Sequence, residues 1–255
     1  CDADIVCLLV PDSQAPKVFN RYIKSHLKKG SALLFSHGYN IHYNLINYPD
    51  YVDIIMVAPS GGGAMVRKEY SNKSGVPALL AVEQNYTGSG LELVKAYGKA
   101  IGSSRICTFL STFKEETETD LYGEQVLLTG GIPKMIEKSL KVLLEDGYSP
   151  VVAWFVCYYE VKMIVDLFHE KGIEHLYKAI SDTARYGGLK VGDYLIDDEY
   201  EIKLKKVLSD IKTGEFKKDL EKNIDNKSYT SSINSKHVEE FSNIMNVLFE
   251  KNKNS

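Results

Sequence analysis

The segment TFKEETETDLYGEQ, residues 112–125, lies where the sequence changes from alternating strands and helices to helices alone. It has a helical pattern and places five carboxylates within ten residues, at Glu115, Glu116, Glu118, Asp120 and Glu124. Carboxylates this close together repel one another, which indicates a bound cation. Asp120 and Glu124 are four residues apart and share one helix face, where they can bind one metal ion or bridge two. A solvated helix face is the alternative, since charge-rich segments are usually of that kind.

The sequence before this segment predicts a sheet. Five short apolar runs alternate with amphipathic stretches, a pattern typical of βα units with parallel strands. We expect strands at residues 3–10, 31–36, 53–59, 77–83 and 105–110. Helices fit at residues 15–27 and 91–101, and a nearby glycine can end each of them. We therefore expect residues 1–113 to form an α/β domain that holds part of a doubly wound, Rossmann-like parallel sheet.

The sequence after the segment predicts helices alone. Pro133 lies at a favoured first helical position, and apolar residues at helical spacing follow it up to Gly147. Further helices are expected at residues 151–171, around residues 204–211 and around residues 238–248. Residues 223–235 are rich in serine and asparagine, which is typical of a loop. We therefore expect an all-helical domain over residues 114–255.

Composition and charge exclude several classes of protein. The chain has 255 residues, of which 44% are hydrophobic and 25% charged, as in globular rather than disordered proteins. Its net charge is −3 and its lysines and arginines form no stripe, so nucleic acid is not an expected partner. The most apolar stretch, residues 151–168, contains Glu160, Lys162 and Asp166, which argue against a membrane span and for a buried helix.

The four cysteines, at positions 1, 7, 107 and 157, have neither disulfide nor zinc-site spacing. They indicate buried thiols in a reducing compartment, so we expect a cytoplasmic protein. The predicted strand at residues 3–10 is apolar on both faces, and neither an initiator methionine nor a signal peptide precedes it. Such a strand belongs inside a parallel sheet, so we expect that an N-terminal portion of the sheet is absent from this chain.

Three loops follow predicted strands, at the place where open α/β sheets bind ligands. His37 can donate to a ligand oxygen there, and Gly38 allows close backbone approach. The loop APSGGG, residues 58–63, can hold a phosphate or a carboxylate with its N–H groups, and Asp12 or Ser13 can contact a nucleotide. Each loop has a structural alternative: a turn histidine, a tight turn, and a cap for the next helix.

A further acidic residue, Glu160, lies inside an otherwise apolar helical pattern, where an unpaired carboxylate is costly to bury. It therefore needs a cation or a hydrogen-bond donor. With Asp120 and Glu124 it forms an oxygen-only set without a histidine, which favours Mg²⁺ or Mn²⁺ over Zn²⁺. The Glu-x-x-His pattern of ferritin-like di-iron bundles is absent from the sequence, which argues against that alternative.

Six motifs, in order along the chain, resemble the ketol-acid reductoisomerase family in its short, class I form. They are LLVPD, FSHGYNIHY, DIIMVAP, FKEETETDLYGEQ, VDL and ISDTARYG. The resemblance implies a cofactor domain followed by a knotted helical domain that intertwines with a second protomer, and hence a homodimer or a larger homo-oligomer. It also implies Mg²⁺-dependent alkyl migration on 2-acetolactate or 2-aceto-2-hydroxybutyrate, followed by NADPH reduction to the 2,3-dihydroxy-3-methyl acid, in valine and isoleucine synthesis.

The resemblance also assigns roles to residues. It implies that Asp120 bridges two Mg²⁺ ions, that Glu124 completes the site of the first ion and that Glu160 binds the second. His37 matches the family's catalytic histidine, and Ser181 matches its contact to the substrate carboxylate. The residues that match cofactor contacts are Asp12, Ser13, Gln14, Ala15 and Gly63.

The chain departs from the family's pattern at three places. Val156 stands where the family has a glutamate, four residues before Glu160, so one ligand of the second Mg²⁺ is missing. Ser60 and Gly62 replace the lysine and proline of the family's APKGPG loop, which removes a positive charge. The glycine-rich turn that holds a dinucleotide is expected upstream of Cys1, and the choice between NADPH and NADH stays open with it. We therefore predict negligible turnover by this polypeptide, and a non-catalytic homologue that keeps the dimerising helical domain is the alternative.

Overall fold

The computed structural model describes residues 3–224 and 236–253. The chain divides into two compact units, Cys1–Leu121 and Tyr122–Ser255. The first unit is built on a five-stranded sheet and the second is helical, which confirms the predicted α/β part followed by helices. The predicted loop at residues 223–235 lies, apart from its first two residues, outside the described part of the chain. A domain boundary at residue 113 stays a prediction.

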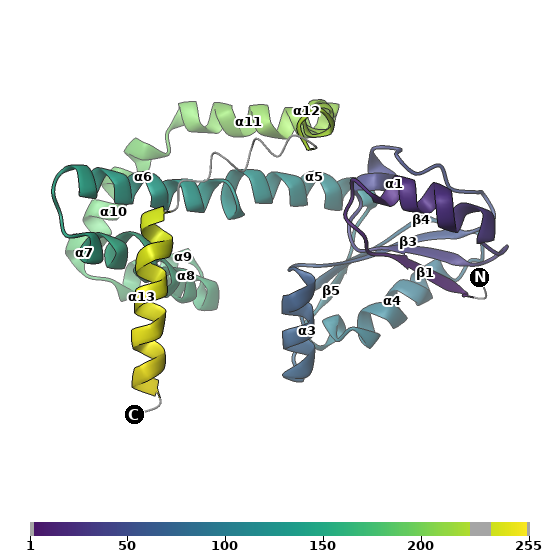
Figure 1. Ribbon diagram of the computed structural model, residues 1–255, viewed down its shortest axis with the longest axis horizontal. Coiled ribbons are helices and arrows are strands. Elements are labelled where there is room, and N and C mark those ends of the chain that lie inside the picture. Colours follow the sequence, from purple (N-terminus) through teal and green to yellow (C-terminus); the bar gives the residue numbers. More distant parts are fainter. Residues whose placement is uncertain (1–2, 225–235, 254–255) are drawn as a thin grey trace. The chain divides into compact units, whose positions relative to one another are not determined.

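The strands lie side by side in the order in which they follow one another along the chain (Figure 1). They are β1 Ile5–Leu8, β2 Ala32–Phe35, β3 Asp53–Pro59, β4 Ala78–Gln84 and β5 Thr108–Leu110. All five predicted strands are therefore present, although β1 and β5 are shorter than expected. The pairs β1–β2, β2–β3 and β4–β5 are parallel, whereas β3 and β4 are antiparallel.

The antiparallel pair corrects the expectation that every strand is parallel. After β3 the chain forms a short helix, α3 Gly63–Ser71, and returns so that Pro59 at the end of β3 pairs with Ala78 at the start of β4. A parallel strand needs a crossover element that packs over the sheet. Because α3 buries none of its residues, it is not such an element. An apolar run predicts a buried strand but not its direction.

Helical segments cover both faces of the sheet (Figure 1). On one face, α1 Ala15–Val18 continues as a π-helix, Phe19–Ile23, and a 3-10 turn, Lys24–His26, which together match the predicted helix at residues 15–27. On the other face lies α4 Gly90–Ala100, as predicted. Short elements complete the unit: α2 Tyr39–His42 and a 3-10 turn at Ser103–Arg105.

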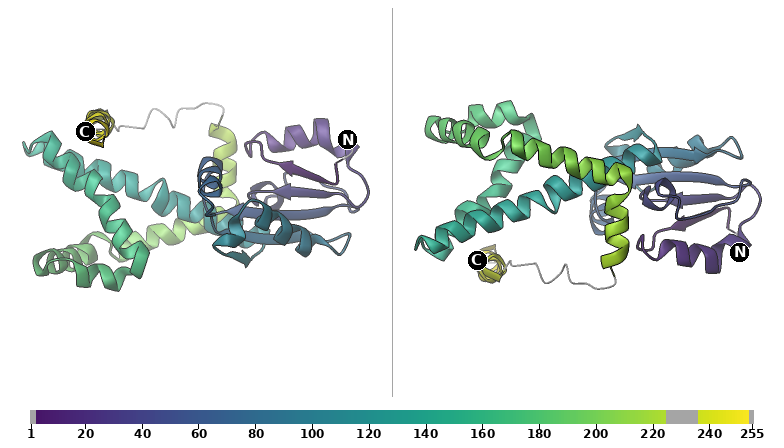
Figure 2. Two further views of the ribbon diagram at one scale, coloured as in Figure 1. Left: turned by 90° about the horizontal axis from the view of Figure 1, so that it is seen from below. Right: turned by 90° about the horizontal axis from the view of Figure 1, so that it is seen from above.

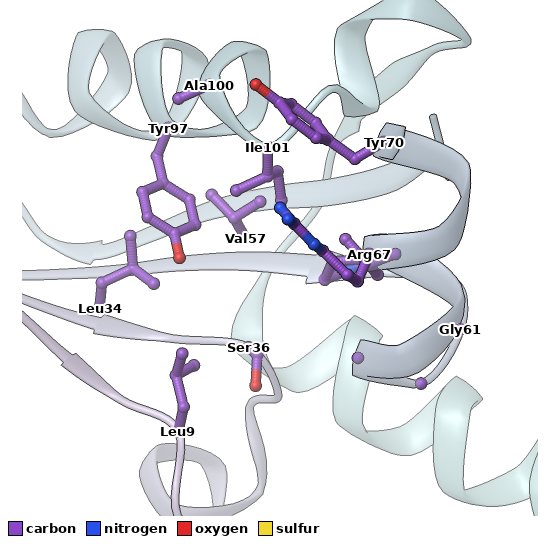
Figure 3. A pocket seen from close by; sticks show the side chains of 14 residues that line it. Leu9, Leu34, Ser36, Val57, Gly61, Arg67, Tyr70, Tyr97, Ala100 and Ile101 are labelled. Carbon is purple, nitrogen blue, oxygen red and sulfur yellow. The ribbon is translucent and has the colours of Figure 1, made fainter. Parts of the chain in front are cut away.

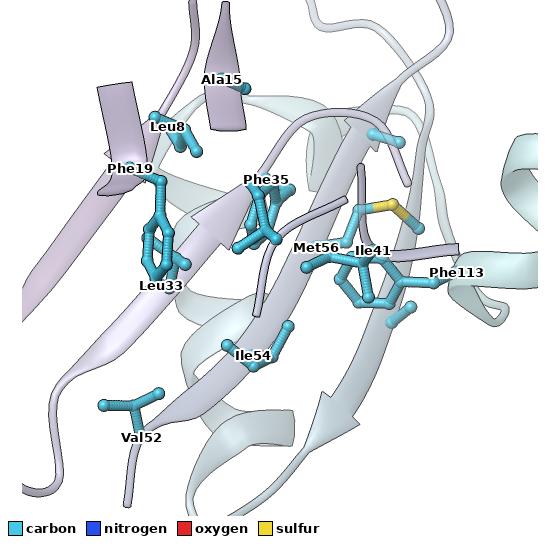
Figure 4. Packing of buried hydrophobic residues seen from close by; sticks show 13 residues of the cluster. Leu8, Ala15, Phe19, Leu33, Phe35, Ile41, Val52, Ile54, Met56 and Phe113 are labelled. Carbon is cyan, nitrogen blue, oxygen red and sulfur yellow. The ribbon is translucent and has the colours of Figure 1, made fainter. Parts of the chain in front are cut away.

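The two cores of the first unit follow from the alternation of side chains along the strands. Leu33 and Ile54 pack under α1 (Figure 4), whereas their neighbours Leu34 and Ile55 pack under α4. All four side chains have 0% exposure, which is why these strands are apolar without interruption in the sequence. The sheet is therefore a rigid platform for the loops at the ends of its strands.

The acidic segment begins as a helix anchored on this platform. Phe113 is the first residue of α5 Phe113–Gly123 and is 1% exposed. Its ring packs edge-on against Phe35 at the end of β2, with the ring centroids 6.0 Å apart (Figure 4). This contact places the first turns of α5 beside the loop that follows β2.

The second unit is helical throughout its described residues. The π-helix Glu124–Leu128 continues α5, and the later helices are α6 Gly131–Glu145, α7 Pro150–Trp154, the π-helix Phe155–Tyr159, α8 Glu160–Lys171, α9 Ile173–Ala179, α10 Asp182–Leu195, α11 Asp198–Thr213, α12 Glu215–Asn223 and α13 Lys236–Lys253. Helix α6 begins at Gly131, so Pro133 is its third residue rather than its first. Gly214, with φ of 77°, ends α11, and the chain turns sharply there into α12 (Figure 2).

The predicted buried helix over residues 151–171 is wrong in its burial. Among its described residues only Ala153 and Trp154 are buried, and Glu160 is exposed. The reason is that the neighbouring helices of this unit cover only that part of the apolar surface. Within the described residues, no helix is long and apolar enough to cross a membrane.

The cysteines also differ from expectation. Cys7 is exposed, and Cys107 and Cys157 are partly buried, so none of these three is a fully buried thiol; Cys1 lies outside the described residues. Cys7 is exposed because β1 pairs only with β2 among the described strands and forms an edge of the sheet.

Candidate active site

His37 lies in the loop after β2, directly before α2, where helix α5 passes close by. Gly38 makes this approach possible, because a Cβ atom there would lie 2.4 Å from Thr117 Oγ1 and 2.6 Å from the Phe113 carbonyl oxygen. Both distances are too short for any side chain without movement of α5. Gly38 thus permits a close approach, as expected, and the group that approaches it is helix α5.

Glu116 is the residue that joins α5 to this loop. The residue is 3% exposed, and its carboxylate accepts hydrogen bonds from His37 Nδ1 and the Gly38 N–H, both at 2.8 Å, and a longer one from Thr117 Oγ1 at 3.3 Å. A buried carboxylate is stable only when its oxygens are paired in this way. Asp120, one helical turn later, has an oxygen 3.5 Å from the same His37 Nδ1. His37, Glu116 and Asp120 therefore form one cluster, and their candidate ligand atoms all lie within 4.8 Å of one another.

The carboxylates set the charge state of His37. Burial disfavours the imidazolium, but the hydrogen bond and charge of Glu116, together with the charges of Asp12 and Asp120, outweigh it and raise the pKa of His37 to about 9. Burial also raises the pKa of Asp120, although the charge of His37 opposes this change. A divalent cation at Asp120 would reverse both effects, because its positive charge favours the carboxylate and disfavours the imidazolium.

One cavity adjoins the cluster, and a second, larger cavity shares the lining residues Leu9 and Ser36 with it. The smaller one measures about 320 Å³ and is lined by His37, Asp12 and Ala15 among others. Asp12 accepts a hydrogen bond from Asn40 Nδ2 at 2.9 Å instead of capping α1. The structural alternative, a cap from Asp12 or Ser13, is therefore wrong: Gln14 occupies the N-cap position, and no side chain caps this helix.

The larger cavity measures about 670 Å³ and contains the predicted glycine loop, Gly61 to Gly63, in its wall. Its apolar lining comes from the sheet and α4, and Arg67 and Tyr70 of α3 extend over it toward Ile101 (Figure 3). Ser13 and Gln14 are exposed in the turn before α1 and line neither cavity. Of the predicted cofactor contacts, Asp12 and Ala15 thus line the cavity that His37 also lines, and Gly63 lines the larger cavity.

The remaining predicted site residues belong to the second unit. Glu124 is the first residue of the π-helix after α5, and Glu160 is the first residue of α8. Both are exposed, and among the described residues neither belongs to the cluster of His37, Glu116 and Asp120. Ser181 is the N-cap of α10, where its Oγ accepts a hydrogen bond from the Ala184 N–H at 3.2 Å. Val156 lies in the π-helix before Glu160 and is 47% exposed.

Comparison with known proteins identifies the family. A model of the acetohydroxy acid isomeroreductase NADPH-binding domain matches residues 1–107, and a model of the ketol-acid reductoisomerase C-terminal domain matches residues 113–248. Together the two matches span nearly the whole chain. The chain belongs to the ketol-acid reductoisomerase family.

Individual members of the ketol-acid reductoisomerase family agree with this. The NADP(+) enzyme of Pyrococcus abyssi is 49% identical over 217 residues, which is 85% of this chain and 65% of that protein. The NADP(+) enzyme of Methanopyrus kandleri is 49% identical over 213 residues, which is 84% of this chain and 64% of that protein. The chain thus spans slightly less than two thirds of the length of these relatives.

A solved structure is also similar. It is an NADH-preferring ketol-acid reductoisomerase from an uncultured archaeon, with a TM-score of 0.91 and 37% identity, covering 96% of this chain and 76% of that one. Other proteins, such as a putative oxidoreductase from Jannaschia at 12% identity and a TM-score of 0.60, share the fold alone.

Glu116, which the structure places at the centre of the cluster, is not among the site residues predicted from the sequence. A signal is present in the sequence, because Glu116 and Asp120 are four residues apart and so share the helix face that meets His37. The sequence does not show which face of α5 meets the sheet, and the packing of Phe113 on Phe35 decides this.

Proposed function

We propose that this chain carries the catalytic centre of a ketol-acid reductoisomerase. The reaction is alkyl migration of 2-acetolactate or 2-aceto-2-hydroxybutyrate with Mg²⁺, followed by reduction of the product with NADPH to the 2,3-dihydroxy-3-methyl acid. The observation that carries the proposal is the pairing of His37 with Glu116 beside Asp120, at the wall of a cavity in a chain of this family.

His37 is the proposed proton-transfer residue. Glu116 accepts the hydrogen bond of Nδ1, which fixes the orientation of the ring and leaves Nε2 to exchange a proton with a substrate oxygen. A histidine is suited to this task when its pKa lies near the working pH. In the absence of a metal the pKa of His37 is about 9, and a cation held by Asp120 would bring it down toward neutrality.

The donor set fits Mg²⁺. Asp120, Glu124 and Glu160 offer hard carboxylate oxygens, and the half-exposed Asp120 has a carboxyl whose pKa is raised by burial, an effect that a bound cation offsets. We propose these three residues as metal ligands and Ser181 as a contact of the substrate carboxylate. Val156 offers no ligand atom, so the second of two ions would be held by fewer groups. When bound, Mg²⁺ would polarise the substrate oxygens and NADPH would supply the hydride.

The larger cavity has the size of a small-molecule site. A volume of about 670 Å³ lies within the range of roughly 300–1,000 Å³ that is usual for small-molecule sites. A Cβ atom at Gly62 or Gly63 would have no heavy atom within 4 Å, so the backbone of these two glycines is open to a ligand. We propose Asp12 to Ala15 and Gly63 as cofactor contacts, and NADPH rather than NADH because the closely similar relatives are named NADP(+) enzymes.

Genetic complementation tests the proposal. The complete gene that encodes this chain, expressed in a bacterium without ketol-acid reductoisomerase, should restore growth without added valine and isoleucine. The same gene with His37→Gln should not restore growth, whereas Cys7→Ser, on the exposed edge strand, should. Failure of the unchanged gene, with the protein present in its folded form, would contradict the proposal.

The second candidate function is that of a non-catalytic homologue. Val156 and Ser60 favour it, because each replaces a charged residue of the family's pattern by an uncharged one. The intact cluster favours the enzyme, since His37 keeps both a carboxylate that orients its ring, Glu116, and a neighbouring candidate metal ligand, Asp120.

The surface of the second unit supports a homodimer or larger homo-oligomer as a further part of the proposal. Its exposed large apolar side chains include Leu127, Leu128, Met135, Val142, Val151, Val152, Met163, Ile164, Leu189 and Leu195. Monomeric proteins rarely leave so much apolar surface uncovered. Sedimentation equilibrium should give at least twice the mass of the chain, 28.6 kDa, and a monomer at micromolar concentration would contradict this. We likewise propose a cytoplasmic location.

A further inference from the structure

The wide helical turn that starts at Glu124 has an unusual hydrogen-bond arrangement. Three donors converge on the Glu124 carbonyl oxygen: the Thr129 N–H at 2.9 Å, the Thr129 Oγ1–H at 2.9 Å and the Gly130 N–H at 3.1 Å. An α-helix would supply one donor from the residue four positions later. Here the donors come from five and six positions later, so the backbone of Glu124 is held by the residues that end the π-helix.

The two glycines after Thr129 are required by space. A Cβ atom at Gly130 would lie 1.9 Å from the Gln125 carbonyl oxygen, and one at Gly131 would lie 2.2 Å from the Val126 carbonyl oxygen. Both are backbone atoms, which cannot move away as the end of a flexible side chain can. Gly130 has φ of −92°, so a left-handed conformation is not the reason for a glycine there.

Thr129, Gly130 and Gly131 thus act together, and we call them the Thr-Gly-Gly clasp. The threonine supplies two of the three donors, and the glycines allow the chain to fold back closely enough for the third. π-Helical turns are rare and occur frequently at functional sites. A turn of this kind that begins at an exposed carboxylate, Glu124, therefore asks for a functional explanation.

We propose that the Thr-Gly-Gly clasp is a positioning element for Glu124 as a metal ligand. By holding the Glu124 carbonyl with three donors, it fixes the backbone from which the carboxylate projects, at the point where α5 ends. Thr129, Gly130 and Gly131 touch neither metal nor substrate, and they act through Glu124. The inference rests on the proposed function, because it takes Glu124 as a ligand of Mg²⁺.

Binding of Mn²⁺, a spectroscopic substitute for Mg²⁺, tests this without an activity assay. Electron paramagnetic resonance of free Mn²⁺ gives the affinity of the full chain and of its variants. Thr129→Val removes the hydroxyl donor but keeps the shape of the side chain, and it should weaken Mn²⁺ binding about 10-fold, as losses of groups that orient ligands do. Thr129→Ser keeps the hydroxyl and should bind Mn²⁺ as the unchanged chain does.

The glycines are tested with a matched pair. Gly131→Ala should weaken Mn²⁺ binding at least as much as Thr129→Val, whereas Gly192→Ala should not, because Gly192 lies in α10 with no heavy atom within 4 Å of its Cβ position. Circular dichroism checks that each variant is folded. If Gly131→Ala does not fold, the comparison of valine with serine at position 129 still decides the proposal.

A double-mutant cycle separates a positioning role from a general structural one. If Thr129 acts through Glu124, then Thr129→Val should have no further effect on Mn²⁺ binding in a chain that already carries Glu124→Gln. Weaker binding in Glu124→Gln with unchanged binding in Thr129→Val would overturn the clasp and leave the proposed function standing. Unchanged binding in Glu124→Gln would overturn the ligand role of Glu124, and the clasp proposal with it.

Discussion

Replacement of Glu116 by glutamine tests how the buried carboxylate holds the site together. Glu116 accepts hydrogen bonds from His37 Nδ1 and the Gly38 N–H, both at 2.8 Å. An amide has one accepting oxygen in place of two and carries no charge, so His37 Nδ1 and the Gly38 N–H can no longer each donate to a carboxylate oxygen. Loss of a bond to a charged group costs about 1.5–3 kcal/mol, and an unsatisfied buried donor adds roughly 1 kcal/mol. Glu116→Gln should therefore lower the free energy of unfolding of the first unit by about 2–4 kcal/mol at pH 7.

The pH dependence of the same variant gives an independent check, in metal-free protein with EDTA. The pKa of His37 is about 9 in the folded chain, above its ordinary value of 6.5. The folded state therefore binds more protons between these values, so the stability from His37 is fully present below pH 6.5 and is lost as pH rises through 9. The free energy of unfolding should fall by up to about 1.4 kcal/mol per pH unit in this window, and Glu116→Gln should remove most of that fall.

Pulsed hydrogen exchange along a urea gradient measures this on peptides from β2 and β3. Trp154 is the single tryptophan and lies in the second unit, so its fluorescence reports whether the variant leaves that unit unchanged. The matched control is Glu115→Gln, because Glu115 is exposed on the same helix and should change stability by less than about 0.5 kcal/mol. Equal free energies of unfolding and equal pH slopes for Glu116→Gln and the unchanged chain would show that Glu116 neither stabilises the first unit nor raises the pKa of His37.

Three further predictions concern α5 and the metal. Gly38→Ala should destabilise the first unit by about 1–3 kcal/mol, because the added Cβ would overlap α5. Gly63→Ala should not destabilise it, because the space around Gly63 is open. Thermal melting compares the two variants. Phe113→Ala should cost about 3–5 kcal/mol and loosen α5 from the sheet, seen as faster hydrogen exchange of α5, and unchanged exchange would contradict this. Val156→Glu should add a ligand, so calorimetric titration with Mg²⁺ should show a second binding event that the unchanged chain lacks or has at least ~10-fold weaker. Because Val156 is 47% exposed, its replacement should leave the melting temperature nearly unchanged.

The sequence predicted the layers of the fold because strands buried on both faces are uninterrupted apolar runs. Residues 53–59 were placed without error, and α4 was placed within one residue at each end. The direction of β4 could not be predicted from an apolar run alone. Gly75, shortly before β4, lies so close to Gly102 that a Cβ at Gly75 would be 2.1 Å from the Gly102 carbonyl oxygen. Such a contact between glycines far apart in the sequence leaves no periodic pattern.

The candidate site was predicted in part for the same physical reason. His37 and Asp120 were found because their residue types and places at a strand end and on a helix face indicate chemistry. Glu116 was not found, because its role depends on which side of α5 faces the loop after β2. The predicted burial of Glu160 was wrong, because Glu160 is exposed. An apolar helical pattern predicts that one face of the helix is covered, but it does not show whether residues of the same chain cover it.

The central claim is that His37, held by Glu116 beside Asp120, serves a Mg²⁺-dependent reductoisomerase. The most direct measurement is the oxidation of NADPH by the complete product of the gene with 2-acetolactate as substrate. We expect one NADPH to be consumed for each 2,3-dihydroxy-3-methylbutanoate formed, only with Mg²⁺, and no consumption with His37→Gln. Folded protein that binds Mg²⁺ and NADPH but leaves 2-acetolactate unchanged would contradict it.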